Sequence, residues 1–412
     1  MNKKHATDNW RQAIIEDSDL CVLCGMCAPK CPTYQVYQRE SESPRGRISL
    51  IQAFAKGELD VDEKLMTHLD HCLGCMACQS ICPSNVPYGR LIDQAKQQLY
   101  KKAPPPGSIR QLLKIILKAS GINRYQPLFR AYKQSGLAWL ANKASNWLPN
   151  RARSILDLAQ QVQSGQLAAY YPSDIPSKGQ LALFTGCMGT LFDLQTLDSS
   201  IRLLNYFGYD VHIPEQQLCC GALHQHNGQI EQARSLAHSN DELFSRLDID
   251  GLIYSANGCG SQLQQQLQRV QSFDIVDFLL NHTRIQSSDF QPLSARVVIH
   301  ESCSSQNILK KTGLSRRLLS LIPELELISI EDNTRCCGAG GSHQLQFPEL
   351  GQQLLAPKLQ QLAEIRPAYL VSDNLGCSLH IQAGVKRQHL STKILHPVSL
   401  LALCLKEPRI KS

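Results

Sequence analysis

Cysteines are the residues of this 412-residue chain whose type and spacing indicate chemistry. Near the start, "CVLCGMCAPKCP" places four thiols within eleven positions and ends in a proline. The same spacing returns 51 residues later in "CLGCMACQSICP". A disulfide would use only two thiols of each run, and structural zinc usually takes pairs of ligands from separated segments. Two copies of one tight run therefore indicate a different metal site.

The spacing C-x2-C-x2-C-x3-C-P is typical of bacterial ferredoxins, in which three thiolates of a run hold one iron-sulfur cluster and the fourth holds the other. By that rule, cluster 1 is predicted to be held by Cys21, Cys24, Cys27 and Cys82. Cluster 2 is predicted to be held by Cys72, Cys75, Cys78 and Cys31. Two [4Fe-4S] clusters that exchange ligands must lie near one another, as electron transfer between them requires.

A second set of cysteines forms an internal repeat. The first unit contains Cys187, Cys219, Cys220 and Cys259, and the second contains Cys303, Cys336, Cys337 and Cys377. Each adjacent pair precedes a glycine, and equivalent cysteines are 116, 117 and 118 residues apart, which indicates a duplication. We predict that these eight thiols converge on a further iron-sulfur centre. A reactive dithiol, a zinc site and plain packing remain the alternatives.

Four histidines near these cysteines could ligate a metal or hydrogen-bond to its ligands: His224, His226, His300 and His380. Any single one of them is more often structural. Cys404 lies in the apolar tail "LLALCL" and is predicted to be a packing residue.

The elements around the two runs are expected to be helical. Residues 48–59, 61–72 and 88–102 have apolar side chains at helical spacing. Residues 1–102 are therefore predicted to form an α-helical ferredoxin-type domain. Arg45 and Arg47, in "SPRGR", are candidates to offset the negative charge of the clusters or to contact a partner.

A basic helical linker is predicted over residues 103–179, after "APPPG" ends the preceding helix. Residues 101–153 hold eleven Lys or Arg and no Asp or Glu, whereas the whole chain has a net charge of +7. A basic amphipathic stretch with tryptophans is able to bind an anionic membrane surface. An inter-domain helix pair or an acidic protein partner is the alternative. Nucleic acid is not expected, because no recognition motif is visible.

Each cysteine unit alternates strand and helix, so that residues 180–290 and 291–412 are predicted to be two α/β domains with parallel sheets. The predicted strands include "LALFTG", "YDVHI" and "GLIYSA", and then "ARVVIH", "LELISI" and "AYLVSD". The cysteines follow these strands, at the carboxyl edge where open α/β sheets bind ligands. The whole chain is predicted to be an α+β multidomain protein.

Composition agrees with an ordinary globular protein, with 43% hydrophobic and 19% charged residues. The first twenty residues lack the apolar stretch of a signal peptide, and no uncharged run of about eighteen apolar residues occurs. We therefore expect a cytoplasmic protein. Thiols in the cytoplasm stay reduced, which favours metal sites over disulfides.

Two ferredoxin-type runs followed by two Cys-Cys-Gly (CCG) domains resemble the iron-sulfur subunit of glycolate oxidase (glycolate dehydrogenase) over nearly the whole chain. "CPTYQ", "SPRGRISLI" and "HLDHCLGCMACQSICPSNVPYGRLID" are similar to that family in detail. The resemblance implies a subunit of an oxidoreductase complex that acts on CH-OH donors. It further implies a separate FAD-containing subunit that oxidises the 2-hydroxy acid, transfer of electrons toward membrane quinone, and peripheral association with the inner (cytoplasmic) membrane.

Alternatives are the equivalent subunit of anaerobic glycerol-3-phosphate or lactate dehydrogenase, and a thiol-disulfide enzyme similar to heterodisulfide reductase. The CCG pattern of heterodisulfide reductase ends in C-x-x-C, whereas Cys259 and Cys377 are followed by no such second cysteine. "GAGGSH" departs from the dinucleotide fingerprint at its last position, and no other flavin or nicotinamide motif is visible. The organic redox step is therefore expected on another chain.

Overall fold

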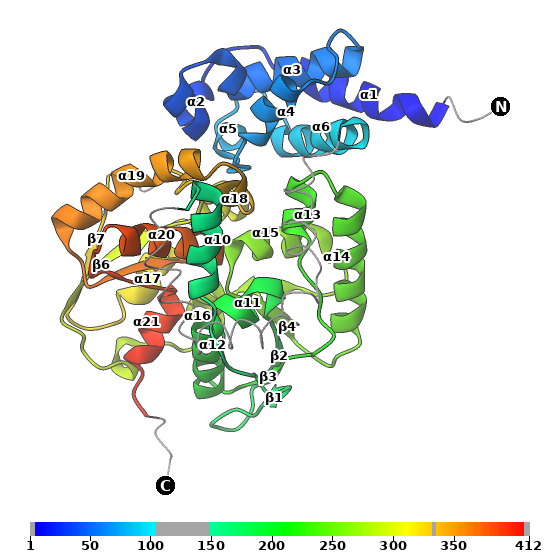
Figure 1. The fold of residues 1–412 in the computed structure, drawn as a ribbon. Helices are drawn as coiled ribbons and strands as arrows, with labels where there is room; N and C mark the ends of the chain where they lie inside the picture. The colour runs from blue at the N-terminus through cyan, green and yellow to red at the C-terminus, as the bar shows by residue number, and fades with distance from the viewer. Residues whose placement is uncertain (1–4, 104–147, 332–334, 408–412) are drawn as a thin grey trace.

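A computed structural model of the chain describes residues 5–103, 148–331 and 335–407. A helical N-terminal region lies across one end of two α/β units, as Figure 1 shows. Most of the basic stretch predicted as a helical linker, residues 104–147, lies outside the described residues. Within the part of the chain that is described, no helix combines the length and the apolar character needed to span a lipid bilayer.

The N-terminal region is helical, as predicted, and its α-helices are α1 (His5–Asp19), α2 (Pro32–Tyr37), α3 (Pro44–Lys56), α4 (Glu63–Asp70), α5 (Ala77–Ser80) and α6 (Tyr88–Lys102). Short 3-10 turns cover Ala28–Lys30 and Glu40–Glu42. Local caps set two of the helix starts: the Ser43 hydroxyl accepts from the Gly46 N–H before α3, and the Asp62 carboxylate accepts from the Leu65 N–H before α4.

The first α/β unit contains a five-stranded sheet in the order β1-β3-β2-β4-β5. Its strands are β1 (Tyr170–Tyr171), β2 (Gly179–Phe184), β3 (Tyr209–His212), β4 (Gly251–Tyr254) and β5 (Ser272–Asp274). All neighbours are parallel except β1, which pairs antiparallel with β3. The helices are α10 (Asn150–Gln160) before the sheet, and then α11 (Gly186–Phe192), α12 (Leu194–Tyr206), α13 (Ala222–His226), α14 (Ile230–Ser245), α15 (Asn257–Gln266) and α16 (Ile275–His282).

The second unit repeats this topology with a four-stranded parallel sheet in the order β7-β6-β8-β9. Its strands are β6 (Ala295–His300), β7 (Leu325–Ile328), β8 (Tyr369–Ser372) and β9 (Lys393–Leu395). A 3-10 turn precedes β6 at Ser287–Asp289, and a π-helix, η6, follows it at Ser304–Leu309. The α-helices are α17 (Leu314–Leu319), α18 (His343–Gln346), α19 (Pro348–Ile365), α20 (Leu375–Arg387) and α21 (Pro397–Leu403).

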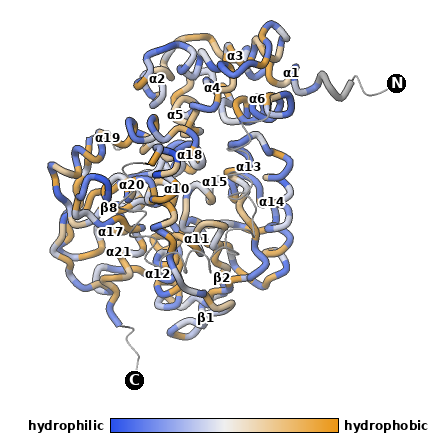
Figure 2. Tube along the Cα trace, viewed as in Figure 1, coloured by the Kyte–Doolittle hydropathy of each residue, from blue (hydrophilic) through white to orange (hydrophobic). Residues whose placement is uncertain are grey.

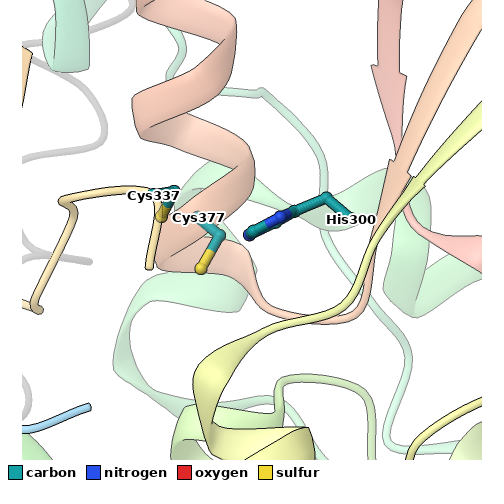
Figure 3. Close-up of side chains that lie close together, drawn as sticks. All are labelled: His300, Cys337 and Cys377. Atoms are coloured by element: carbon teal, nitrogen blue, oxygen red, sulfur yellow. The ribbon is translucent and has the colours of Figure 1, made fainter. Parts of the chain in front are cut away.

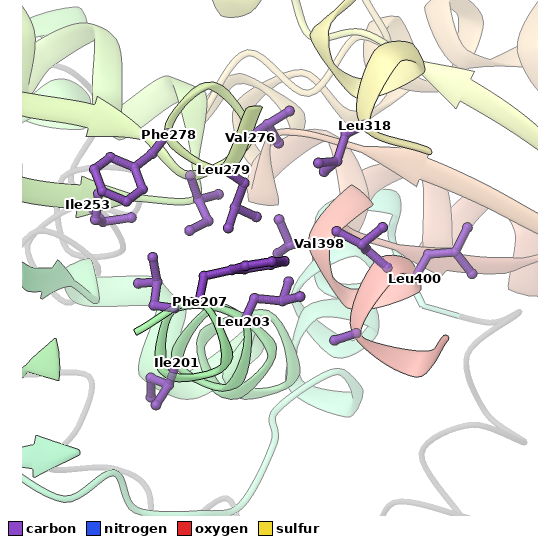
Figure 4. Packing of buried hydrophobic residues seen from close by; sticks show 14 of the residues in the cluster. Ile201, Leu203, Phe207, Ile253, Val276, Phe278, Leu279, Leu318, Val398 and Leu400 are labelled. Atoms are coloured by element: carbon purple, nitrogen blue, oxygen red, sulfur yellow. The ribbon is translucent and has the colours of Figure 1, made fainter. Parts of the chain in front are cut away.

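One hydrophobic core joins the two units. Helices α12 and α16 of the first unit meet α17 and α21 of the second, and buried side chains such as Leu203, Leu279, Leu318 and Val398 pack there (Figure 4). Apolar residues line the strands while the outer turns of helices such as α14 are hydrophilic (Figure 2). Burial of this shared face fixes the units against one another, so that the loops after their strands open toward a common space.

The predicted fold class is confirmed: a helical ferredoxin-type region precedes duplicated units with parallel sheets. All six strands predicted from apolar runs are present. The short strands β1, β5 and β9 were not predicted, because two or three residues carry too little pattern. The domain boundaries remain predictions.

Candidate metal centres

The eight thiols of the two runs surround two adjoining cavities in the helical region. Cys21, Cys24, Cys27 and Cys82 line the first, called here the first-run cavity. Cys31, Cys72, Cys75 and Cys78 line the second, the second-run cavity, and Cys78 also borders the first. The fourth cysteine of each run thus lies with the three leading cysteines of the other run. This arrangement agrees with the exchanged ligand sets expected from the spacing, which remain a prediction.

The backbone of the two runs winds in the same way. Leu23 and Gly74, the equivalent residues before the second cysteine, both have positive φ, at 55° and 62°. Gly25 and Met76, the equivalent residues after it, have φ of 80° and 55°. Non-glycine residues adopt this left-handed region at a cost. Both runs accept this cost at equivalent positions. The backbone path that directs several thiols into each cavity is therefore specified by the fold.

The thiols of the second-run cavity form a donor set that fits a multi-iron centre. Burial raises the pKa of Cys75 well above its usual value, and the neighbouring Cys303 raises it further. Burial and the nearby Cys75 and Cys72 likewise raise the pKa of Cys78. Several thiolates this close together need a cation among them to ionise, and iron-sulfur clusters are held by such thiolates.

A buried arginine lies beside the second-run cavity. The side chain of Arg47 is 1% exposed, and its Nη2 lies 2.6 Å from the Glu42 carboxylate. Its Nη1 donates to the Glu42 carbonyl at 2.8 Å and toward the Cys31 sulfur at 3.8 Å. Arg45, the other arginine predicted to act here, is more exposed, pairs with Glu40 at 2.6 Å and donates to the Leu23 carbonyl.

Glu42 is the centre of this buried charge network. His68 and His71 place their Nδ1 atoms 2.7 and 3.0 Å from one carboxylate oxygen, and Arg47 contacts the other. Burial alone would raise the pKa of Glu42, but the hydrogen bonds from the two histidines and the charge of Arg47 lower it below its usual value. The carboxylate therefore stays ionised next to the cavity.

Arg47→Gln is expected to destabilise the protein by about 3 to 5 kcal/mol, because removing one partner of a buried pair leaves an uncompensated charge. The measurement is anaerobic guanidinium unfolding followed by circular dichroism. Arg45→Gln is the matched control, since it breaks an exposed pair two residues away on the same helix and should have a far smaller effect. Equal losses in the two variants would contradict this account of Arg47.

The eight cysteines of the duplicated units line a single cavity of about 200 Å³ between those units, called here the inter-unit cavity. Each lies beyond the carboxyl end of a strand: Cys187 after β2, Cys219 and Cys220 after β3, Cys259 after β4, Cys303 after β6, Cys336 and Cys337 after β7, and Cys377 after β8. The sequence-based expectation of convergence therefore agrees with the geometry. What these thiols bind stays a prediction.

The thiols of the first unit touch one another inside this cavity. Cys187 and Cys219 have their sulfurs 3.4 Å apart, and the Gly221 N–H donates to the Cys219 sulfur at 3.4 Å. Hydrogen bonds from Cys187 and Cys220 lower the pKa of Cys219 to about 3. The pKa of Cys187 is raised in turn, chiefly because its proton bonds to Cys219. A thiol with a lowered pKa that accepts hydrogen bonds from two neighbouring thiols is a suitable start for metal binding.

The second unit adds a histidine to its thiols. The ligand atoms of His300, Cys337 and Cys377 all lie within 4.8 Å of one another, and all three residues are buried. Figure 3 shows the His300 ring, at the end of β6, pointing toward the two sulfurs. Phe184 occupies the equivalent position of the first unit, 116 residues earlier. The two units therefore offer different donor sets beside the cavity.

The other three candidate histidines have different partners. His224 Nδ1 lies 2.8 Å from the Gln229 side chain, and His380 Nε2 lies 3.1 Å from the Gly351 carbonyl. His226 faces Asp93 at 3.7 Å across the boundary with α6. Within the described residues, only His300 of these four forms a cluster with cysteines at ligand distance.

The second-run cavity adjoins the inter-unit cavity. Cys75 interacts electrostatically with Cys303 and Cys336, and these three cysteines belong to one apolar cluster around Leu73. Asn307, in the π-helix after Cys303, donates its side-chain N–H to the Cys75 carbonyl at 2.8 Å. The three cavities thus lie in a row: first-run, second-run, inter-unit.

Sequence reasoning missed two asparagines that join the units at the inter-unit cavity. Asn374 accepts from the Gly258 N–H at 3.0 Å and donates to the Cys377 sulfur at 3.4 Å. Asn257, its counterpart 117 residues earlier, has its N–H 3.1 Å from the Asp373 carbonyl. The repeat itself carries the signal, because an asparagine precedes the last cysteine in both units.

Comparison with known families assigns both halves of the chain. A family described as "4Fe-4S dicluster domain" matches residues 17–86. A family described as "Cysteine-rich domain" (CCG) matches twice, over residues 181–264 and 297–382. The chain is therefore an iron-sulfur protein with two [4Fe-4S] clusters and a duplicated cysteine-rich domain.

Three relatives illustrate the range of similar proteins. A probable glycolate oxidase iron-sulfur subunit of Bacillus subtilis (strain 168) is 30% identical over 413 residues, covering 92% of each chain. The glycolate oxidase iron-sulfur subunit of Escherichia coli (strain K12) is 27% identical, covering 97% of this chain and 98% of that one. Lactate utilization protein A of Geobacillus thermodenitrificans (strain NG80-2) is 23% identical, covering 54% of this chain and 98% of that one.

Proposed function

Because the chain belongs to the family of glycolate oxidase iron-sulfur subunits, an oxidoreductase family, we propose that it carries electrons from a partner FAD subunit, which oxidises glycolate to glyoxylate, toward quinone. The observation that supports this proposal best is the row of three adjoining cavities lined by sixteen cysteines. When bound, a [4Fe-4S] cluster accepts and releases one electron at a time. A row of such centres is what electron transfer through a protein requires.

The proposed ligands follow from the cavities. Cys21, Cys24, Cys27 and Cys82 would hold one cluster, and Cys31, Cys72, Cys75 and Cys78 the other. A further iron-sulfur centre is proposed in the inter-unit cavity on the cysteines of the two duplicated units. The chemistry of the substrate itself is assigned to the partner, because this chain contains no flavin or nicotinamide fingerprint.

The protein surroundings of the cavities support the same role. The second-run cavity is bordered by buried Leu73, Met76 and Tyr88, which exclude water from the thiols. Tyr88 donates its hydroxyl toward the Cys72 sulfur at 3.6 Å, and Arg47 places a positive charge beside Cys31. Hydrogen bonds and charges of this kind help to set the reduction potential of an iron-sulfur centre.

The proposal includes the place of action. Delivery of electrons to quinone requires contact with the cytoplasmic membrane, and we propose a cytoplasmic protein that associates peripherally with that membrane. The basic stretch of residues 101–153 supports this, because eleven cationic side chains without an acidic one would be attracted to anionic lipids.

Glycolate is the proposed substrate of the complex, with lactate as the second candidate. The similarity to the two glycolate oxidase subunits spans at least 92% of this chain, whereas the similarity to lactate utilization protein A spans 54%. A match over nearly the whole chain therefore favours glycolate over lactate.

The test uses the complex purified anaerobically from its own cells through a tag on this chain. Glycolate is expected to reduce the clusters of this chain, seen as bleaching of visible absorption and as new EPR signals, at least about tenfold faster than lactate or glycerol 3-phosphate do. Faster reduction by lactate would show that lactate, and not glycolate, is the substrate of the complex. Reduction by none of these, in a complex whose clusters respond to dithionite, would refute the proposed function.

A further inference from the structure

The exposed apolar side chains of the described residues concentrate on one loop. Of the seven large hydrophobic residues that stand exposed there, four lie within residues 20–26: Leu20, Val22, Leu23 and Met26. Val22 is 68% exposed and Leu23 is 57% exposed. This first-run loop encloses the first-run cavity, and it contains Cys24, which alone among the seventeen cysteines is classed as exposed.

The equivalent loop of the second run is covered by another part of the chain. Leu73, the equivalent of Val22 by the 51-residue offset, is 9% exposed and packs with Cys336, Leu350 and Leu354 of the second unit. A Cβ atom at Gly340 would lie 2.8 Å from Leu73 Cδ2 and equally near His343 Cβ, so Leu73 packs closely against this glycine. The second-run loop is therefore a docking surface between two parts of this chain.

Docking of the second-run loop brings one particular thiol to the neighbouring site. Cys75 packs in the same apolar cluster as Cys303 and Cys336 of the second unit. Its equivalent in the first run, again by the 51-residue offset, is Cys24. Cys75 and Cys24 are thus equivalent thiols. Cys75, in the covered loop, faces cysteines of the inter-unit cavity, and Cys24, in the uncovered loop, faces the outside.

The strained backbone of Leu23 indicates that the apolar side chain at this exposed position has a purpose of its own. The Leu23 φ of 55° lies in the left-handed region, where the equivalent residue of the second run is Gly74. A glycine would adopt this conformation without strain. A leucine with a largely exposed side chain gains little from burial within the chain to offset that strain.

From this correspondence we propose that the first-run loop is the docking surface for the electron-donating partner subunit. The partner covers Val22, Leu23 and Met26 as the second unit covers Leu73, and so brings its redox cofactor close to Cys24. Each transfer moves one electron from the reduced partner to this chain, so two transfers follow each two-electron oxidation of a hydroxy acid. The identity of the partner rests on the proposed function.

A protein partner fits the loop better than a lipid surface does. Two nearby arginines are paired with carboxylates, Arg45 with Glu40 and Arg90 with Asp17, and Lys30 is the one exposed lysine within four residues of the loop. An anionic lipid site usually presents a cluster of several Lys or Arg, and one lysine falls short of that. Apolar anchors with polar and charged residues around them are typical of the centre and rim of a protein interface.

The test is the double variant Val22→Asp/Leu23→Gly in the full chain. Both positions are exposed, and glycine copies residue 74, so the fold is expected to be kept. Because both residues also border the first-run cavity, iron content and dithionite-reduced EPR are measured in the same samples, and the variant is compared with the unaltered chain at equal cluster content. The Kd for the purified flavoprotein partner, measured by biolayer interferometry, is expected to rise by about tenfold or more. Substrate-driven reduction of the clusters by limiting partner should slow by a similar factor.

The matched control is Leu403→Asp, an exposed leucine on α21 at the far end of the molecule from the helical region (Figure 1). It should leave both measurements unchanged. An unaltered Kd in the double variant would overturn the docking proposal while substrate-driven reduction of the wild type still supports the proposed function. Loss of binding to phosphatidylglycerol vesicles, with partner affinity retained, would also overturn it and assign the loop to the membrane.

Discussion

Cys82→Ala is expected to abolish the cluster of the first-run cavity and to leave that of the second-run cavity intact, although Cys82 belongs to the second run. The reason is that Cys82 lines the first-run cavity with Cys21, Cys24 and Cys27. Electron flow from glycolate to quinone should fall by about a hundredfold or more, because the row of centres is interrupted at its first member. The partner should still reduce an artificial dye.

The measurement combines anaerobic iron analysis, EPR of the dithionite-reduced protein and a quinone-reduction assay. One [4Fe-4S] signal should disappear and about four irons should be lost. Cys404→Ala is the control, since that thiol is buried in the apolar core that joins the two units, a cluster with no other cysteine, and should affect none of these readings. If Cys82→Ala instead eliminates the cluster of the second-run cavity, the exchanged ligand sets are wrong.

The sequence was most informative where function requires a fixed residue type at a fixed spacing. Thiols are scarce and their spacing reflects a local loop, so both runs and the duplicated set could be recognised without a structure. Parallel strands buried on both faces read as continuous apolar runs, which made β2, β4, β6 and β8 predictable. A loop that contains a cysteine follows each of these strands.

Other parts of the site depend on contacts between distant segments and had no local signal. Arg47 and Arg45 are alike in the sequence, yet only Arg47 lies under the Glu42 carboxylate, because α3 buries that face against α4. The distinction between an exposed and a covered cysteine loop likewise arises from domain packing: Leu73 meets the second unit and Val22 does not.

The sequence shows a histidine in one duplicated unit where the other has a phenylalanine, but this difference could be interpreted only once the strands were placed. His300 and Phe184 end equivalent strands; Phe184 lines the inter-unit cavity, whereas His300 is buried next to two cysteines that line it. Only in the structure does the histidine meet Cys337 and Cys377. The second unit, which also adjoins Cys75, is thus the unit better placed to exchange electrons with the second-run cavity.

Cys336→Ala/Cys337→Ala is therefore expected to have the second large effect. The unaltered chain should contain about twelve or more irons, and the double variant about eight, because the centre in the inter-unit cavity would lose two adjacent ligands while both four-thiol cavities are kept. EPR signals of the two [4Fe-4S] clusters should persist. Quinone reduction should fall at least about tenfold, because the row then ends at Cys75.

The matched comparison is Cys219→Ala/Cys220→Ala, the same change in the first unit. A smaller loss of iron and activity there than in the second unit is expected, because only the second unit has the additional His300 donor and because Cys303 and Cys336 pack with Cys75. His300→Phe, which copies Phe184, should alter the spectrum of the additional centre without changing the two [4Fe-4S] signals. About eight irons in the unaltered chain, with full activity in both double variants, would show that the inter-unit cysteines serve packing and not electron transfer.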